Sequence, residues 1–180
     1  MRKDFIIAGF GGQGVQSLGK ALARVLDKKG FLVSLKSNYG PETRGGVSYT
    51  EVVVKETPDD WPEVLTVNVL VAMSQQAYNA WIGRLAPEAQ VFYDTDFVTR
   101  PASINAPQYP VPATKMATEL GAPIAANMVM LGAVMAITDM APLATLQEVI
   151  QEEMGRRAAI SLKAAEAGYK EGSLTGSNFG

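Results

Sequence analysis

The chain has 180 residues, of which 47% are hydrophobic and 19% charged, and its formal net charge at pH 7 is −2. This length and composition are ordinary for one globular domain with a sizeable core. The sequence contains no cysteine and no histidine. These absences exclude a disulfide, an iron–sulfur cluster held by this chain, a thiol nucleophile, an imidazole base and the usual zinc sites. We therefore predict no metal site in this chain, and we assign no catalytic residue to it.

Charge and hydropathy also limit the partners and the location. No run of basic residues is longer than two, so nucleic acid is not an expected partner. The apolar runs 5–10 and 67–73 are much shorter than the ~20 residues of a membrane span. Residues 1–3 resemble the start of a signal peptide, but Asp4 and the short apolar run behind it argue against one. The sequence therefore predicts a cytoplasmic protein without a membrane segment.

The first element is a strand that leads into a glycine-rich turn. Residues 5–8 are apolar and predict a buried strand, and Gly-Phe-Gly-Gly-Gln-Gly follows at 9–14. From Val15 to Leu26 the apolar residues recur with helical spacing. Glycine permits positive φ and close approach of a ligand, and a helix start offers free N–H groups to an anion. Strand, turn and helix together therefore predict a phosphate-binding or dinucleotide-binding unit.

The turn matches the pattern G-x-G-x-x-G at Gly9, Gly11 and Gly14, which leaves several ligands open. NAD is disfavoured, because the second strand ends in Lys36-Ser37 and not in the carboxylate that would hold the ribose hydroxyls. The 2′-phosphate of NADP or the 3′-phosphate of coenzyme A would suit Lys36 better. A tight turn that binds no ligand is the remaining interpretation.

A loop of unusual composition follows the second strand, which we predict over 31–37. The loop, residues 38–46, has three glycines, one proline and an opposite-charge pair, more than a plain connector needs. Apolar and polar side chains alternate over residues 47–55, which predicts a strand with one face more exposed to solvent. The connector is too short for a crossover helix, so this strand should run antiparallel to a neighbour or lie at an edge.

Strands and helices alternate from residue 65 on. Apolar runs mark the strands, and Ser74 is a good helix N-cap. In chain order we expect a buried strand (65–73), a helix (74–81), a strand (90–94), a short extended piece near Tyr109 and a short helix (113–120).

Two helices complete the predicted domain. Residues 123–137 are apolar on every side, which predicts a helix buried in the core or also in contact with another subunit. Asn127 within it must find a hydrogen-bond partner, and we expect a structural one. Residues 143–167 predict a last amphipathic helix. The remainder is rich in glycine and serine, so we expect a single domain over 1–168 and a flexible C-terminal tail over 169–180.

This order of elements predicts an α/β fold with three layers, in which helices cover a mostly parallel, Rossmann-like sheet with one or more antiparallel strands. In such sheets ligands bind beyond the carboxyl ends of the strands. Both glycine-rich loops, 9–14 and 38–46, follow strands. They should therefore meet on the same rim, and this convergence predicts a binding site there.

Four motifs carry a family resemblance. They are Gly-Phe-Gly-Gly-Gln-Gly at 9–14, Tyr-Gly-Pro-Glu-Thr-Arg-Gly-Gly at 39–46, Pro-Ile-Ala-Ala-Asn-Met-Val-Met-Leu-Gly at 123–132 and Lys-Ala-Ala-Glu-Ala-Gly-Tyr at 163–169. Together they resemble the gamma subunit of 2-oxoacid:ferredoxin oxidoreductases, which act on pyruvate, 2-oxoglutarate or branched-chain 2-oxoacids. The related indolepyruvate oxidoreductase beta subunit shares the glycine turn, but the second motif and the short chain fit the gamma subunit better.

The resemblance implies one subunit of a larger enzyme. That enzyme decarboxylates a 2-oxoacid on thiamine diphosphate, passes electrons through iron–sulfur clusters to ferredoxin and forms an acyl-CoA. Partner subunits of the alpha, beta and delta type hold the thiamine diphosphate and the clusters, so this chain alone binds no cofactor and should be inactive in isolation. The absence of cysteine and histidine agrees with that division. We favour 2-oxoglutarate as the 2-oxoacid, with pyruvate and branched-chain acids as alternatives.

The resemblance also places the gamma subunit at the coenzyme A side of the active site. By position, we expect the first loop to form a backbone cradle for an anion or cofactor from Gly11, Gly12, Gln13 and Gly14. In the second loop we expect cofactor-binding roles for Tyr39, Glu42 and Arg44. Arg44 either forms a bidentate pair with a phosphate or carboxylate, or pairs with Glu42 and only stiffens the loop.

Two other functions remain open from sequence alone. A free-standing NADP-binding oxidoreductase is supported by the glycine pattern and Lys36, and it would bind NADPH at micromolar levels without binding coenzyme A. A non-catalytic scaffold would use both glycine loops only to dock partner subunits. In that case Arg44→Ala would break assembly and leave the coenzyme A affinity of the assembled enzyme unchanged.

Overall fold

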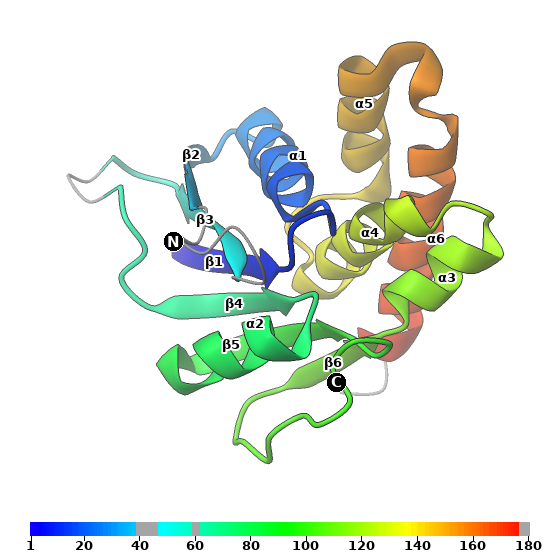
Figure 1. Cartoon of the computed structure of the whole chain (residues 1–180). Coiled ribbons are helices and arrows are strands. Elements are labelled where there is room, and N and C mark those ends of the chain that lie inside the picture. The colour runs from blue at the N-terminus through cyan, green and yellow to red at the C-terminus, as the bar shows by residue number, and fades with distance from the viewer. Residues whose placement is uncertain (39–46, 59–61, 177–180) are drawn as a thin grey trace.

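Figure 1 shows a computed structural model of the chain, which describes residues 1–38, 47–58 and 62–176. A six-stranded sheet forms its centre, with the strand order β2-β3-β1-β4-β5-β6. The strands are β1 (Arg2–Gly9), β2 (Leu32–Asn38), β3 (Ser48–Lys55), β4 (Val67–Ala72), β5 (Leu85–Asp94) and β6 (Gln108–Val111). The helices are α1 (Val15–Lys28), α2 (Gln75–Trp81), α3 (Ala113–Glu119), α4 (Ala126–Thr138), α5 (Leu143–Met154) and α6 (Ala159–Gly176), with short 3₁₀ segments η1 (Ile82–Arg84), η2 (Pro123–Ala125) and η3 (Gly155–Arg157).

The sheet is mostly parallel, as predicted. β1 pairs in parallel with β4, β4 with β5, and β5 with β6. β3 runs antiparallel to both of its neighbours, so that Val52 lies opposite Phe5 of β1 and opposite Leu35 of β2. The prediction of an antiparallel strand over 47–55 is thus confirmed, but the alternative of an edge position is wrong, because β3 lies between β2 and β1.

Helices cover both faces of the sheet, which confirms the three-layer prediction. Successive side chains of a strand point to opposite faces. On β1, Phe5 and Ile7 belong to the core shared with α1, α3, α4, α5 and α6, whereas Ile6 and Ala8 belong to the core shared with α2. Figure 1 shows α2 on one side of the sheet and the other helices across from it.

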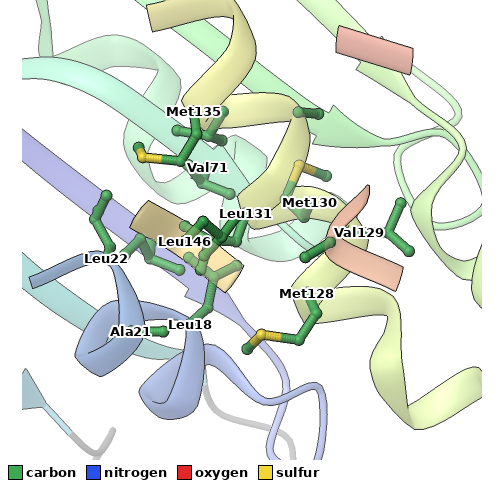
Figure 2. Packing of buried hydrophobic residues seen from close by; sticks show 14 of the residues in the cluster. Leu18, Ala21, Leu22, Val71, Met128, Val129, Met130, Leu131, Met135 and Leu146 are labelled. Atoms are coloured by element: carbon green, nitrogen blue, oxygen red, sulfur yellow. The ribbon is translucent and has the colours of Figure 1, made fainter. Parts of the chain in front are cut away.

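The apolar helix predicted over 123–137 is α4, and it lies in the core. Every residue from Ala126 to Met135 is buried, because α4 packs against α1, α3, α5 and α6. Figure 2 shows Met128, Met130 and Met135 of α4 among leucines of α1 and α5. Although α4 is strongly apolar, no helix in the described part of the chain is long and apolar enough to cross a membrane.

Glycines allow α4 and α6 to cross with their backbones in contact. A Cβ on Gly132 of α4 would overlap the carbonyl oxygen of Ala165, and a Cβ on Gly168 of α6 would overlap the carbonyl oxygen of Val129. One turn further along α6, a Cβ on Gly172 would lie 2.7 Å from the carbonyl oxygen of Ala133. These glycines are therefore packing residues of the core.

The C-terminal region differs from the prediction in two ways. The expected single helix over 143–167 is broken into α5 and α6 at Gly155, whose φ of 53° does not continue a helix. The helix end near Ala167 is also wrong, because α6 continues to Gly176. Glycine lowers helix propensity in isolation, but tight packing against α4 overrides it here. Residues 177–180 of the expected tail lie outside the described residues.

Candidate functional site

The loop between β1 and α1 folds tightly against the end of β4. Gly9 leaves no room for a side chain, since a Cβ there would lie 2.6 Å from Oε1 of Gln13 and 2.9 Å from Cβ of Met73. Gly14, the N-cap of α1, has a φ of 73° in the left-handed region that favours glycine. The shape of the loop therefore requires glycine at both ends.

The side chain of Gln13 fixes this loop to the sheet. Its Oε1 accepts a hydrogen bond from the backbone N–H of Phe10 at 2.7 Å, and its Nε2 donates to the carbonyl oxygen of Met73 at 2.7 Å. The first bond closes the loop on itself, and the second connects the loop after β1 to the segment after β4. The amide of Gln13 is therefore engaged within the protein, and the backbone of the loop is what faces outward.

Asn127 of α4 secures the other end of the loop. Its Nδ2 donates to the carbonyl oxygen of Gly14 at 3.3 Å, and its Oδ1 accepts from the backbone N–H of Met128 at 2.9 Å. A Cβ on Gly14 would overlap the Asn127 amide. The prediction of a structural partner for Asn127 is confirmed, and this contact sets the position of the α1 N-terminus against α4.

The middle of the loop and the start of α1 are open. Gly11 and Gly12 are exposed, and a Cβ on either would meet no described atom within 4 Å. Among the described residues, no side chain caps the start of α1, and its first turn carries no acidic residue. An uncapped helix start has free N–H groups and a positive dipole end, so this surface is suited to bind an anion.

A cleft of about 290 Å³ opens beside this helix start. It lies between the ends of β1 and β4, which are neighbouring parallel strands. After β1 the chain continues into α1 on one face of the sheet, and after β4 it continues into α2 on the other face. Ligands of open α/β sheets bind at such a switch point. Its lining includes Gly12, Gln13, Met73, Phe97, Thr114 and Ile124. Ile124 is 81% exposed and Phe97 41% exposed, so the mouth of the cleft has an apolar lip.

A buried carboxylate holds two walls of the cleft together. Asp94, at the end of β5, is fully buried. Its Oδ2 accepts hydrogen bonds from the Thr114 backbone N–H at 3.1 Å and hydroxyl at 2.6 Å, and its Oδ1 accepts from the Asp96 backbone N–H at 3.1 Å. Burial raises the pKa of Asp94, and the hydrogen bonds from Thr114 oppose that rise. Asp94 thereby connects the start of α3 to the turn that carries Phe97.

The predicted residues of the second loop, Tyr39, Glu42 and Arg44, lie outside the described residues. The residues flanking that loop are described, and they lie at the same rim as the first loop. Ser48 pairs with Gly9 at the end of β1, and the Ser48 hydroxyl accepts a hydrogen bond from Nε2 of Gln16 at 3.2 Å. The predicted meeting of both loops at one rim is supported as far as these flanks reach.

The structure thus places Gly12 and Gln13 in the lining of one cleft, with Gly11 and Gly14 next to them in the same loop, and neither Asp94 nor the apolar lip had been predicted. A strand that ends in Val-Phe-Tyr-Asp at 91–94 could have pointed to Asp94, because carboxylates at strand ends reach the rim of the sheet. The exposure of Ile124 depends on how the helices pack, so it could not be predicted from the sequence. In the described part of the chain, no cluster of three or more Asp or Glu side chains could hold a metal ion.

Comparison with solved structures supports the fold. The gamma subunit of a keto/oxoacid ferredoxin oxidoreductase from Geobacter sulfurreducens superposes with a TM-score of 0.87 at 24% identity, covering 97% of this chain and 98% of that one. A 2-oxoglutarate:ferredoxin oxidoreductase from Magnetococcus marinus, solved with 2-oxoglutarate, coenzyme A and succinyl-CoA bound, gives a TM-score of 0.87 at 24% identity and covers 96% of this chain. This chain spans 31% of that one.

Sequence comparison gives the family. The 2-oxoglutarate synthase subunit KorC of Methanocaldococcus jannaschii is 35% identical over 160 residues, which are 86% of this chain and 84% of that subunit. The family model described as pyruvate ferredoxin/flavodoxin oxidoreductase matches residues 4–171. That match covers the glycine loop and the part of the α4–α6 crossing that contains Gly132 and Gly168. The chain therefore belongs to the pyruvate ferredoxin/flavodoxin oxidoreductase family.

Proposed function

We propose that this chain is the gamma subunit of a 2-oxoacid:ferredoxin oxidoreductase and forms the coenzyme A side of its active site. The observation that carries the proposal is the uncapped start of α1 beside an open cleft at the switch point of the sheet. Coenzyme A carries several phosphate groups, and free N–H groups at a helix start bind phosphate. The enzyme forms an acyl-CoA from a 2-oxoacid, so one of its subunits must position that thiol substrate.

The loop residues have separate roles in this proposal. Gly11 and Gly12 let a phosphate approach the backbone, because nothing described occupies the space where their Cβ atoms would be. Gln13 acts as a positioning residue, since both of its side-chain hydrogen bonds hold the loop in place. Gly14 is the N-cap of α1, and its left-handed backbone conformation sets the direction in which the helix starts. The cradle therefore binds through its backbone and leaves the chemistry to other subunits.

The cleft is small, so this chain holds part of the substrate. Its volume of about 290 Å³ lies below the ~300–1,000 Å³ of pockets that enclose a drug-sized ligand. Subunits of the alpha, beta and delta type complete the site and carry thiamine diphosphate, which cleaves the carbon–carbon bond, and the clusters that pass electrons to ferredoxin. The exposed lip of Ile124 and Phe97 then faces those subunits. The proposal places the enzyme in the cytoplasm.

The second glycine loop is proposed to complete the phosphate site. Tyr39, Glu42 and Arg44 follow β2 and precede β3, whose described ends lie at the rim beside Gly9. A guanidinium matches a phosphate in bidentate fashion, so Arg44 is assigned to the coenzyme A phosphates. Arg44→Ala should raise the KM for coenzyme A of the assembled enzyme and leave its subunit composition intact.

We propose 2-oxoglutarate as the 2-oxoacid, because the similar KorC subunit is named for 2-oxoglutarate synthase. The test is anaerobic purification of the native complex through this chain, followed by coenzyme A-dependent reduction of a viologen dye. Larger subunits should co-purify, and 2-oxoglutarate should support the fastest reduction. Faster reduction with pyruvate or a branched-chain 2-oxoacid would correct the substrate, and a chain that purifies alone without activity would contradict the subunit role.

The coenzyme A role is tested by a matched pair of glycine substitutions in the assembled enzyme. Gly11→Asp places a carboxylate at the anion site, whereas Gly83→Asp places one in equally open space on η1. Gly11→Asp should raise the KM for coenzyme A roughly tenfold or more, a loss of about 1.4 kcal/mol in binding, with the KM for the 2-oxoacid unchanged. Equal effects of the two substitutions would contradict the proposal.

Two other outcomes would favour the other functions. Loss of partner subunits in Gly11→Asp, with normal coenzyme A affinity in the complex that remains, would support a scaffold. Binding of NADPH to the purified chain, without binding of coenzyme A to the complex, would support an NADP-dependent oxidoreductase. The KM pattern, the subunit composition and the NADPH-binding measurement together separate all three functions.

A further inference from the structure

β2 is an edge strand with features of an interface. No strand in the described part of the chain pairs with its outer side. Two of its side chains, Leu32 and Leu35, are 45% and 41% exposed. An edge strand offers unpaired N–H and C=O groups, and proteins usually protect such an edge with charges, proline or a bulge. Exposed leucines on an unpaired edge strand favour association with another chain, so they are unfavourable for an edge that remains in contact with water.

A groove of about 390 Å³ lies between this strand and α1. Apolar side chains of Ala23, Val33 and Leu35 line it. The charged residues Lys20, Arg24 and Asp27 of α1 line it as well, together with Glu153 of α5. The groove therefore combines an apolar surface with a row of charges along one helix.

The charges along α1 are suited to pair with their own copies. Arg24 already forms an ion pair with Glu153 at 3.4 Å. Lys20 and Asp27, at the two ends of the row, form no ion pair with another described residue. A twofold axis through the middle of the groove would place Lys20 of each copy opposite Asp27 of the other. This arrangement of charges is self-complementary.

We propose that the β2 edge binds the same edge of a second copy of this chain, so that two sheets join into one. Twofold pairing of two identical strands is antiparallel and isologous. The register we infer centres on Ser34, so that Ser34 lies opposite the partner's Ser34. Val33 then faces the partner's Leu35, and Leu32 faces the aliphatic stem of the partner's Lys36. These pairs cover the apolar side chains that the single chain exposes.

The spacing of the helices leaves room for long side chains to meet between them. α1 packs on β2, β3 and β1 and is therefore centred near β3, and neighbouring strands are about 4.8 Å apart. A twofold axis beside β2 therefore puts the two α1 helices about 12–14 Å apart, which is wider than the ~8–10 Å of direct helix packing, and the long side chain of Lys20 spans this gap toward Asp27 of the other copy. The residues that line the groove centre on Ser34 in β2 and between Ala23 and Arg24 in α1. Strand pairing and charge pairing therefore share one axis.

A single cysteine tests the register directly, because the natural chain has none. Directly opposite residues in an antiparallel pair have Cα atoms about 4.5–5.5 Å apart, within the ~4.4–6.8 Å that a disulfide spans. Ser34→Cys should therefore cross-link most of the protein under mild oxidation. Ser37→Cys is the matched control on the same strand, where the two copies would be about 20 Å apart. It should not cross-link.

The experiment is done on both the purified full chain and the assembled enzyme. Cross-linking of Ser34→Cys to a second copy in both samples is the expected result. Absence of the cross-link in a folded protein, or equal cross-linking of Ser37→Cys, would overturn the proposal. If the Ser34→Cys thiol becomes protected from alkylation upon assembly without cross-linking to itself, a different subunit covers the edge, and the proposal is wrong.

A charge exchange tests the helix contact. Lys20→Glu and Asp27→Lys should each weaken the dimer about tenfold, because each removes two symmetric ion pairs and adds like-charge contacts. The double variant Lys20→Glu, Asp27→Lys should restore the affinity measured by sedimentation. Failure of the double variant to recover, or a chain that stays monomeric at all concentrations, would contradict the pairing. The dimer does not depend on coenzyme A binding, so the proposed function can fail independently.

Discussion

Two groups of glycines in this chain serve opposite purposes. In the α4–α6 crossing, backbone atoms of the facing helix fill the space where the Cβ atoms of Gly132, Gly168 and Gly172 would be. In the loop after β1, the space beside Gly11 and Gly12 contains no described atom within 4 Å. The first group lets two helices approach closely, and the second group leaves the backbone of the loop open. Because Gly83 is equally open, the proposed binding role of Gly11 and Gly12 depends on the open space together with the uncapped start of α1 beside the cleft.

The largest expected effect is at the helix crossing. Gly168→Ala puts a methyl group onto the carbonyl oxygen of Val129, so α6 must move away from α4 along much of its length. We expect the free energy of unfolding to fall by about 3 kcal/mol, the upper range of overpacking effects, as measured by denaturant unfolding of the purified chain.

The matched control lies in the same helix. A Cβ on Gly176 would be in ordinary contact with Ile137 at 3.7 Å. Gly176→Ala should therefore leave stability unchanged or raise it by up to about 1 kcal/mol, because alanine favours the helix. Equal destabilisation by both substitutions would show that the crossing is not the cause.

The next effect concerns the buried carboxylate. Asp94→Asn keeps the size of the side chain but replaces one acceptor oxygen with a donor, which then faces either the backbone N–H of Asp96 or the backbone N–H of Thr114. We expect a loss of about 2 kcal/mol in unfolding free energy, the cost of a buried unsatisfied group. Asp96→Asn, at an exposed position on the same turn, should change stability by less than about 0.5 kcal/mol.

A smaller effect is expected where the loop is fastened to the sheet. Gln13→Glu keeps an acceptor for the Phe10 N–H but removes the donor to the Met73 carbonyl oxygen. Stability should fall by about 1 kcal/mol, the net value of one hydrogen bond, and the KM for coenzyme A should rise because the loop is held less firmly. An unchanged KM would mean that the position of the loop does not matter for the substrate.

The smallest effect on stability is expected at Gly11, in the open part of the loop. Gly11→Ala adds a methyl group to free space and should change the unfolding free energy by less than about 0.5 kcal/mol. Gly12→Ala should cost about 1–2 kcal/mol, because the φ of Gly12 is 90° and its backbone is strained for alanine. A loss at Gly11 as large as at Gly168 would remove the distinction between the two groups.

Most of the fold could be predicted from local patterns. Apolar runs and helical periodicity located β1, α1, β4 and α4, and the short connector showed that β3 is antiparallel. The errors occurred where tertiary contacts determine the bounds of a helix or strand. α6 continues past Gly168 because α4 packs on it, and β5 begins at Leu85, five residues before the predicted Gln90, because it pairs with β4 there.

The candidate site was predicted less completely. Glycine spacing identified the loop, and the connectivity of the strands identified the rim. From sequence alone, Gly14 could not be distinguished from Gly11. Gly14 is held by Asn127 and Gly11 is open to solvent, and this difference depends on a contact between residues 113 positions apart along the chain. Asp94 was missed for a similar reason, since its partners on α3 adjoin it only after folding.

Hydrogen exchange of the assembled enzyme tests most directly the claim that the open start of α1 holds coenzyme A. Amide exchange is measured with and without saturating coenzyme A, for peptides covering residues 10–17 and, as a control, 159–176. Coenzyme A should slow exchange in 10–17 and leave 159–176 unchanged, because bound phosphate accepts hydrogen bonds from the N–H groups at the helix start. Unchanged exchange in 10–17 while coenzyme A is bound would contradict the proposed binding site.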